Sequence, residues 1–131
     1  MANSAIRRTR RTTRRVLRSE LRRRAAHNRL AASCRRRPRS LATVALAAGV
    51  AKNTVTGVTN GLRSVAKRIH LTPAATARTR RTVAGGRAHK TRPVTRWTLA
   101  QVRTLLAAYR PRKAEFVAAV TLLAAFAGGA R

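Results

Sequence analysis

The sequence predicts an all-α protein: a small helix-turn-helix domain with a basic N-terminal arm and a C-terminal helical hairpin. Three observations support this class. Apolar residues recur at helical spacing in 41–59 and 99–127, cationic side chains dominate elsewhere, and residues typical of helix ends flank the apolar segments. The predicted divisions are an Arg-rich arm at 1–39, the helix-turn-helix with a basic linker at 40–96, and the hairpin at 97–131.

The charge balance restricts the possible functions. Lys and Arg number 31 against two acids, so the formal net charge is +29. Asp is absent and Glu20 and Glu115 are the only carboxylates, so a paired-acid hydrolase, a carboxylate-held magnesium site and a Ser-His-Asp triad lack their parts. We therefore expect no enzyme and no cofactor. His70 and His89 have no ligand partners at metal spacing, and Cys34 is expected as a surface thiol.

The type and distribution of the cations indicate a polyanionic partner. Arg accounts for 27 of the 31 and Lys for 4, and the guanidinium group pairs bidentately with phosphate oxygens. The net charge is +14 in residues 1–39, +1 in 40–61, +10 in 62–96 and +4 in 97–131. A nearly uncharged segment between two basic ones favours nucleic acid, with double-stranded DNA as the first expectation and RNA as the second.

The N-terminal arm carries its Arg residues in pairs and triplets, which repel one another until a polyanion neutralises them. Val16, Leu17, Leu21 and Ala25 fall at helical spacing, so we expect an arm that is disordered or conditionally helical and stops at Pro38. A solvated tail and an Arg-rich transit peptide are the alternatives. The arm residues expected to bind phosphates are Arg7, Arg8, Arg10, Arg11, Arg14 and Arg15.

The segment 40–61 has the spacing of a helix-turn-helix. Ser40 can cap a first helix, and Gly49 supplies the left-handed residue that the turn needs. A second helix is predicted from about 51 to 59, and Asn60-Gly61 ends it with turn chemistry. The apolar residues expected on the inner faces and in the corner between the helices are Leu41, Val44, Ala45, Ala48, Val50, Val55 and Val58.

This segment resembles the N-terminal DNA-binding headpiece of the lac repressor family, whose run reads roughly T-L-x-D-V-A-x-x-A-G-V-S-x-x-T-V-S-R-V-L-N-G. Thr43 departs from its Asp, Ala51 from its capping Ser, Thr59 from its Leu, and Gly57 from an Arg of its recognition helix. The resemblance covers 22 of 131 residues. It implies DNA binding, but not the family's sugar-responsive mechanism. The matching residues are Leu41, Val44, Ala45, Ala48, Gly49, Val50, Thr54, Val55, Val58, Asn60 and Gly61, with Ser40 and Thr56 as conservative replacements.

In the helix-turn-helix interpretation, the first turn of the second helix enters the major groove. Lys52 can then donate to guanine, and Asn53 can pair bidentately with adenine. Thr54 and Thr56 are expected to donate to phosphates, Thr54 from near the helix N-terminus. The alternative is that Lys52 and Asn53 are simply exposed polar residues.

The basic linker is predicted to hold two more helices. The first, at 62–69, places Leu62, Val65 and Ile69 on one face, and the second runs from Ala74 to Val83. The linker residues expected to bind phosphates are Arg63, Lys67 and Arg68.

The C-terminal segment is more apolar and predicts two helices. Thr98 begins the first and Arg110-Pro111 closes it, and the second extends from Ala114 to Ala127. The second helix is shorter than a membrane span and contains Glu115, so we expect no membrane insertion but a possible homodimer through residues 97–127. The face predicted for the first helix comprises Leu99, Val102, Leu105, Leu106 and Tyr109.

These features together predict a DNA-binding protein, a small helix-turn-helix transcriptional regulator of bacterial, phage or plasmid type. Its Arg-rich arms would bind duplex phosphates, and the central helix would add a modest base preference. The expected location is the cytoplasm, associated with the nucleoid. A nucleoid-condensing or genome-packaging protein, located within a virion in the latter case, and an rRNA-binding structural protein are the alternatives.

Overall fold

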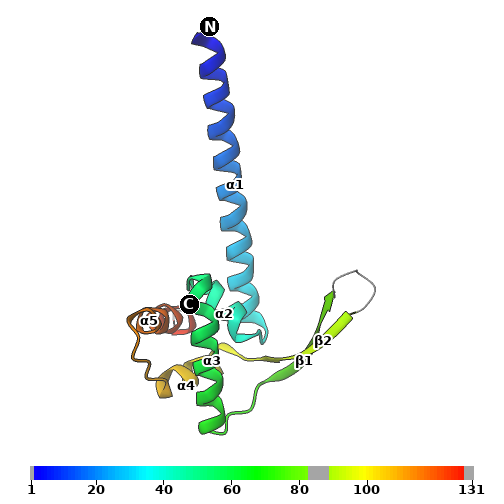
Figure 1. The fold of residues 1–131 in the computed structure, drawn as a ribbon, viewed down its shortest axis with the longest axis vertical. Coiled ribbons are helices and arrows are strands. Elements are labelled where there is room, and N and C mark those ends of the chain that lie inside the picture. The colour runs from blue at the N-terminus through cyan, green and yellow to red at the C-terminus, as the bar shows by residue number, and fades with distance from the viewer. Residues whose placement is uncertain (1, 83–88, 129–131) are drawn as a thin grey trace.

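The computed structural model describes residues 2–82 and 89–128 of the chain, and it describes the side chains outside 79–90. The protein is mostly helical and carries one small two-stranded sheet, so the all-α expectation holds only coarsely (Figure 1). The elements in chain order are α1 (Ala2–Arg36), α2 (Leu41–Ala47), α3 (Lys52–Arg68), β1 (Ala75–Thr82), β2 (His89–Arg96), α4 (Leu99–Ala108) and α5 (Ala114–Gly128).

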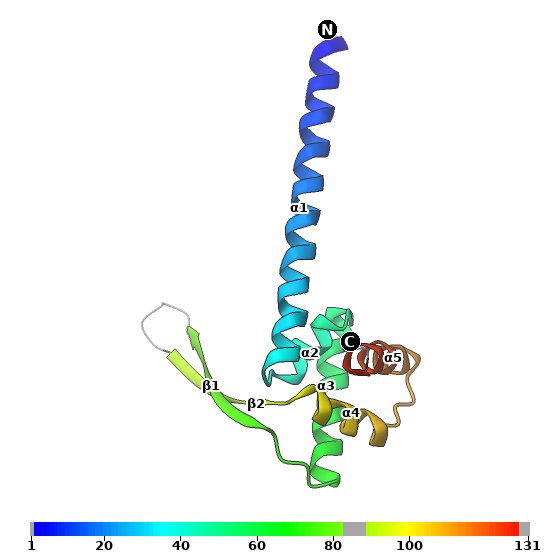
Figure 2. The ribbon, with the colours of Figure 1, turned by 180° about the vertical axis from the view of Figure 1, so that it is seen from behind.

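The N-terminal arm is one continuous helix, α1, which projects from the body of the molecule (Figures 1 and 2). It contains neither Gly nor Pro, and Arg, Ala and Leu are good helix formers. Its 35 residues make it about 50 Å long. Residues 2–29 are exposed, whereas Ala31 and Cys34 are buried against the body. The helix ends at Arg36, two residues before Pro38, where the sequence predicts a stop.

Cys34 corrects one expectation. Its side chain is 2% exposed, so it is a core residue and not a surface thiol. Burial raises the pKa of the Cys34 thiol, and the charges of Arg39 and Arg35 offset part of that rise. The last turns of α1 therefore belong to the folded body, whereas its first 28 residues or so stand free.

The connection between α2 and α3 has two local features that the sequence predicts, the Ser40 cap and the left-handed Gly49. The Ser40 hydroxyl accepts a hydrogen bond from the Thr43 amide at 3.3 Å and caps α2. Gly49 has φ +91°, a left-handed conformation that other residues rarely adopt. Val50 is 5% exposed and its amide donates to the Ala45 carbonyl at 3.1 Å, which fixes the turn between the two helices.

The prediction that α3 ends at Asn60-Gly61 is wrong, because α3 continues to Arg68 and absorbs the separate helix predicted at 62–69. The two glycines inside α3 explain the difference. A Cβ at Gly57 would overlap the Phe116 ring, and a Cβ at Gly61 would lie 2.6 Å from the Tyr109 hydroxyl. Each glycine costs about 1 kcal/mol of helix propensity, and close packing against these rings offsets that cost.

The helix predicted at Ala74–Val83 is also wrong, and Val83 itself lies outside the described residues. Residues 75–82 form β1, which pairs antiparallel with β2 in the register Ala75 to Arg96 and Thr82 to His89. This pairing is a non-local interaction that local helix propensity does not report. We call the β1–β2 pair the ribbon; it projects from the body away from α5 (Figures 1 and 2).

Within the described ranges, one isolated backbone bridge joins the end of the ribbon to the rest of the chain. The Trp97 amide donates to the Arg39 carbonyl at 2.8 Å, and the Arg39 amide donates to the Trp97 carbonyl at 3.1 Å. The bridge joins the α1–α2 connection to the residue between β2 and α4. Thr98 then caps α4 through a capping box with Gln101.

The core lies where α2, α3, α4 and α5 meet, with the end of α1 packed against it. Leu62, Val102, Leu105 and Leu123 are among its most buried side chains, and α4 and α5 occupy the positions that the apolar pattern predicts. Within the described ranges, none of the helices has both the length and the apolar character that crossing a membrane requires.

Truncation of Leu105 tests this core. Leu105 is 0% exposed, so Leu105→Ala should lower the free energy of unfolding by about 2–5 kcal/mol. Urea denaturation followed by circular dichroism measures the change. Leu21→Ala, at a side chain 64% exposed on α1, is the matched control and should change the unfolding free energy little. An equal effect of the two substitutions would contradict this core.

Candidate nucleic-acid interface

One face of α3 is polar, exposed and free of acidic residues. Residues on a helix that lie three or four positions apart share a face, and this spacing joins the first turn of α3 to its last. The neighbouring faces hold the buried residues Val55, Val58, Leu62 and Val65, so the core fixes which side of α3 meets solvent. We call this surface the α3 face; its exposed residues are Lys52, Asn53, Thr56, Asn60, Arg63, Ser64 and Lys67.

The sequence predicts four DNA-contacting residues in the first turns of α3, and two of them lie at its exposed start. Lys52 and Asn53 are both exposed, as a residue that reads bases must be. Thr56 is exposed one turn later. Thr54 is 6% exposed and its hydroxyl donates to Asn53 Oδ1 at 3.3 Å. Its buried position does not fit the expected phosphate contact, and it holds the Asn53 side chain instead.

Sequence reasoning missed Asn60, because Asn-Gly is typical of a turn. The structure places Asn60 in the middle of the α3 face, where its Oδ1 accepts a hydrogen bond from Arg63 Nη1 at 3.2 Å. The spacing from Asn53 through Thr56 to Asn60 could have revealed it, had the helix been extended through Gly61.

The α3 face is bounded by aromatic side chains on the side of α4 and α5. Phe116 covers Gly57, the position at which the lac repressor family has an Arg, and Lys113 Nζ lies 5.4 Å from the centre of the Phe116 ring. Arg68 lies at this boundary, and its Nη2 donates to the Ala108 carbonyl at 2.9 Å. A cation is favourable there because Ala108 ends α4.

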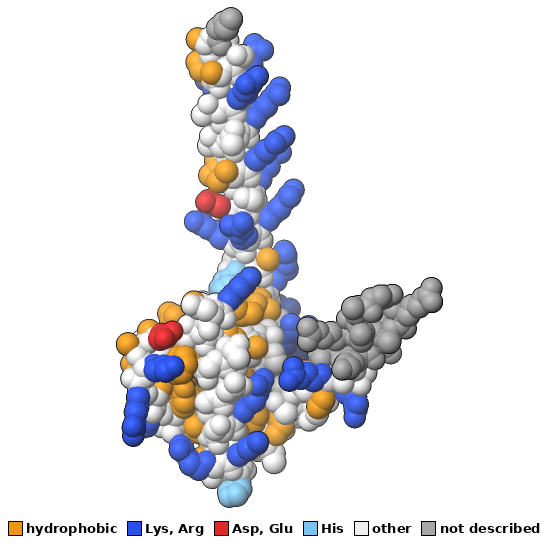
Figure 3. Space-filling model, viewed as in Figure 1, with side chains coloured by type: hydrophobic (Ala, Val, Ile, Leu, Met, Phe, Trp, Pro, Cys, Tyr) orange, Lys and Arg blue, Asp and Glu red, His pale blue; other side chains and the backbone are white. Residues whose placement is uncertain are grey.

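The Arg residues of α1 form a second basic surface. Arg8, Arg15, Arg22, Arg29 and Arg36 follow one another at intervals of seven residues, about 10 Å along the axis. We call this set, with Arg11 and Arg18 between its members, the Arg line. Figure 3 shows Lys and Arg side chains following one side of α1 toward the base of the ribbon. All of these residues are exposed, and so are the predicted phosphate contacts Arg7, Arg8, Arg10, Arg11, Arg14 and Arg15.

The opposite side of α1 carries apolar side chains. Ile6, Val16, Leu17 and Leu21 are each about half exposed or more. Glu20, the one acid of the helix, is exposed among them. The Arg line is therefore free of acidic side chains along its whole length.

The ribbon adds cations of its own. Arg78 is exposed and its Nη1 donates to Thr91 Oγ1 of the other strand at 3.2 Å. Arg92 is exposed and Arg96 is partly buried. The sequences of the two strands contain no acid, so the ribbon presents positive charge beside the body of the molecule.

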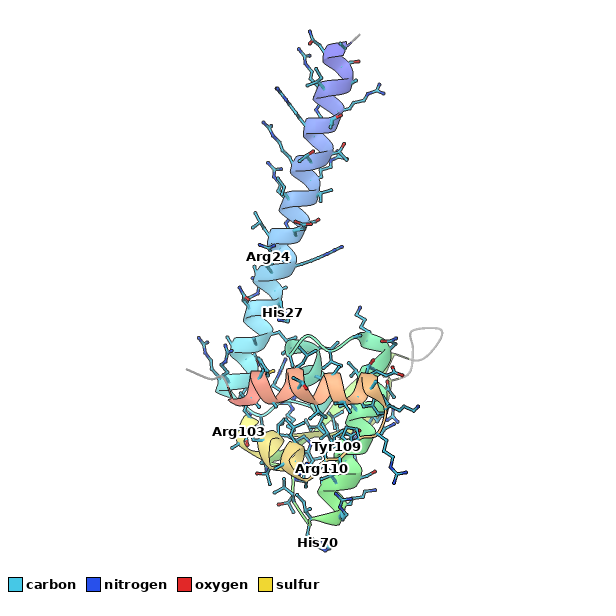
Figure 4. The ribbon with its side chains drawn as sticks, turned by 90° about the vertical axis from the view of Figure 1, so that its left-hand side faces the viewer. Arg24, His27, His70, Arg103, Tyr109 and Arg110 are labelled. Atoms are coloured by element: carbon cyan, nitrogen blue, oxygen red, sulfur yellow. The ribbon has the colours of Figure 1, made fainter. Side chains whose placement is uncertain are left out.

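The charged and polar groups of the body surround a hydrophobic centre. Figure 4 shows His70 at the end of α3 that is farthest from α1, with Arg103 and Arg110 on the α4 side. Among the described residues, no cluster of three or more His, Cys, Asp or Glu side chains could hold a metal ion. What the arrangement offers chemically is a set of hydrogen-bond donors and positive charges suited to phosphate and base edges.

Comparison with protein-family models, with curated proteins and with solved structures finds no match to the chain.

Introducing Arg at position 57, where the lac repressor pattern has it, tests this geometry. Helix propensity favours Arg over Gly by about 1 kcal/mol, but overpacking against a neighbouring side chain typically costs about 1–3 kcal/mol. Because the Phe116 ring covers Gly57, Gly57→Arg should lower the free energy of unfolding in urea. Thr56→Arg, at the exposed neighbour, should change it by less than about 0.5 kcal/mol. A stabilised Gly57→Arg protein would show that Phe116 does not cover this position.

Proposed function

We propose that the protein binds double-stranded DNA as a small helix-turn-helix transcriptional regulator. The observation that carries the proposal is the α3 face, which is uncovered from Lys52 to Lys67 and holds three cations, two Asn side chains and no acid. A helix that presents only donors and amides on its open side is suited to a groove lined by phosphates and base edges.

The order of elements supports this interpretation. The chain passes from the end of α1 through Arg39 into α2 and α3, and then into the two strands of the ribbon. The second strand returns the chain to Trp97, which pairs with Arg39 in the backbone bridge. We interpret this order as a helix-turn-helix with a wing, in which α3 enters the major groove and the ribbon lies over the adjacent backbone. Strand ribbons are an established means of contacting DNA.

The geometry of α3 favours DNA over RNA. The major groove of B-DNA, about 12 Å wide, admits an α-helix, whereas the major groove of A-form RNA is deep and too narrow for side-chain readout. The four aromatic residues are too few for a stacking platform, and Trp97 is 3% exposed. Structured RNA is therefore the less favoured ligand.

Two layers of recognition follow from the two basic surfaces. The Arg line contacts phosphates without regard to sequence and supplies most of the affinity. Asn53 and Asn60 supply base preference, because an Asn amide pairs bidentately with adenine. A condensing or packaging protein is the second candidate, favoured by the greater number of cations on α1 than on the α3 face.

Selection of the full chain on random duplex DNA near physiological salt separates the two candidates. A regulator enriches a short motif, whereas a packaging protein gives flat enrichment. Asn53→Ala and Asn60→Ala should each cost about 1–3 kcal/mol on the selected motif and little on random duplex. Thr104→Ala, at an exposed polar residue of α4, is the control and should leave both affinities unchanged. Equal losses on motif and random duplex would refute base reading, and preferential retention of structured RNA would refute DNA as the ligand.

The salt dependence of binding tests the Arg line. Replacing Arg8, Arg11, Arg15, Arg18 and Arg22 with Gln should reduce the slope of log K against log salt by up to about 4.5, at roughly 0.9 per lost phosphate contact. The same five positions changed to Lys keep the charge and should keep most of the slope. Fluorescence anisotropy of a labelled duplex measures both. An unchanged slope in the Gln protein would exclude α1 from the interface.

A further inference from the structure

A hollow of about 470 Å³ lies between the last turns of α3, the segment 69–74 and the end of β2. The chain leaves α3 at its lower end in Figure 1 and turns toward β1. Residues 70–73 of this turn line the hollow. Its volume falls within the range of about 300–1,000 Å³ that is usual for small-molecule sites. The proposed DNA contacts leave its floor unused.

The floor of the hollow is apolar and held in place. Ala66, Leu71, Pro73 and Trp97 contribute to it. The Trp97 backbone is fixed by the bridge to Arg39, and its indole Nε1 donates to Thr95 Oγ1 at 3.1 Å. These hydrogen bonds hold the indole ring in place, and 3% of the Trp97 side chain is exposed.

The wall opposite Trp97 is also fixed. The Leu71 amide donates to the Ala66 carbonyl at 3.0 Å and the His70 amide to the Lys67 carbonyl at 3.3 Å, the two bonds of a Schellman motif. His70 takes the left-handed position of that motif with φ +56°, where Gly is usual. Gln101 Nε2 donates to the Thr72 carbonyl at 2.8 Å and ties the segment to α4.

Two cations, Arg63 and Lys67, line the hollow beside His70, and its lining includes no acid. The two acids of the chain lie elsewhere, Glu20 on the free part of α1 and Glu115 in the first turn of α5. Within the described part of the chain, the Lys67 ammonium therefore has no carboxylate to pair with.

We propose that this hollow binds a small amphipathic anion, a carboxylate with an apolar body. The carboxylate would pair with Lys67 and Arg63 at the rim, and the body would lie on Leu71 and Pro73, next to the small exposed part of Trp97. Inorganic phosphate would leave the apolar floor exposed, and an uncharged apolar molecule would leave the cations unpaired, so the combination of charge and apolar body fits best.

The position of the hollow links such a ligand to DNA, in a step that rests on the proposed function. Arg63 and Lys67 belong both to the rim and to the α3 face. An anion bound between them neutralises charges that a DNA phosphate would otherwise contact. The ligand would thus weaken DNA binding and make the regulator responsive to an acidic metabolite.

Trp97 is the only tryptophan of the chain and lines the hollow, so its fluorescence reports binding directly. The full-length protein is titrated with octanoate, and with 1-octanol as the uncharged counterpart. We expect a saturable fluorescence change with octanoate and an affinity at least tenfold lower for 1-octanol. Equal affinities for the two probes, or no saturable change with octanoate, would overturn the proposal.

Lys67→Gln should weaken octanoate binding at least fivefold and leave the circular dichroism spectrum unchanged, since Lys67 is exposed. Arg103→Gln removes one exposed cation from α4, away from the hollow, and should bind octanoate like the original protein. If both substitutions weakened octanoate binding equally, the loss would reflect the lower net charge of the protein, and the proposed site would be refuted.

A second measurement separates this inference from the proposed function. Octanoate should weaken binding of the original protein to a labelled duplex, and should do so less in Lys67→Gln. A fluorescence response without any DNA binding would refute the proposed function and leave the anion site standing. If octanoate changed the Trp97 fluorescence but left DNA binding unchanged, the proposed link between the anion site and DNA binding would be refuted.

Discussion

Repulsion between like charges is the constraint on which the rest of this structure depends. Two acids cannot neutralise 31 cations, so the fold must keep its positive charges apart and out of its interior. It does so by placing 15 Arg residues in the N-terminal 39 residues, most of them on a helix that stands away from the body. The body is then free to build its core from the nearly uncharged segment 40–61 and the apolar C-terminal helices. Partners that carry negative charge relieve the same repulsion, so the chemistry of binding follows from the constraint on folding.

The parts of the fold that could be predicted are those fixed by local chemistry. Ser40 caps α2 and Gly49 turns the chain because a hydroxyl and a missing Cβ act within a few residues. The parts that could not be predicted depend on distant residues. In the sequence, Gly61 predicts the end of a helix. Only the structure shows that α3 continues through Gly61 because Tyr109 packs against it. Residues 75–82 form a strand because 89–96 pair with them, and their own sequence has no sustained alternation of apolar and polar residues that would mark a strand.

Some residues of the candidate site could also be predicted from local sequence, and others depend on distant parts of the chain. Lys52, Asn53 and Thr56 could be placed from the resemblance, since they stand at the start of a helix whose beginning is marked in the sequence. Asn60 could not, because its role depends on the continuation of α3, and Thr54 could not be recognised as buried without the packing of α3 against the core. Because Phe116 covers Gly57, there is no room at this position for the Arg that the lac repressor pattern has. Asn53 and Asn60, the side chains that we propose to read bases, lie along the open side of α3, and Phe116 bounds this side toward α5.

The single helix α1 also gives the molecule a direction. Its free residues extend for about 40 Å from the body, slightly more than one turn of a DNA duplex, and they do so on one side only. A polyanion that contacts the Arg line would therefore extend beyond the body on the α1 side. The molecule is thus asymmetric in the way it presents its charge, with the longest basic surface on one side of the body.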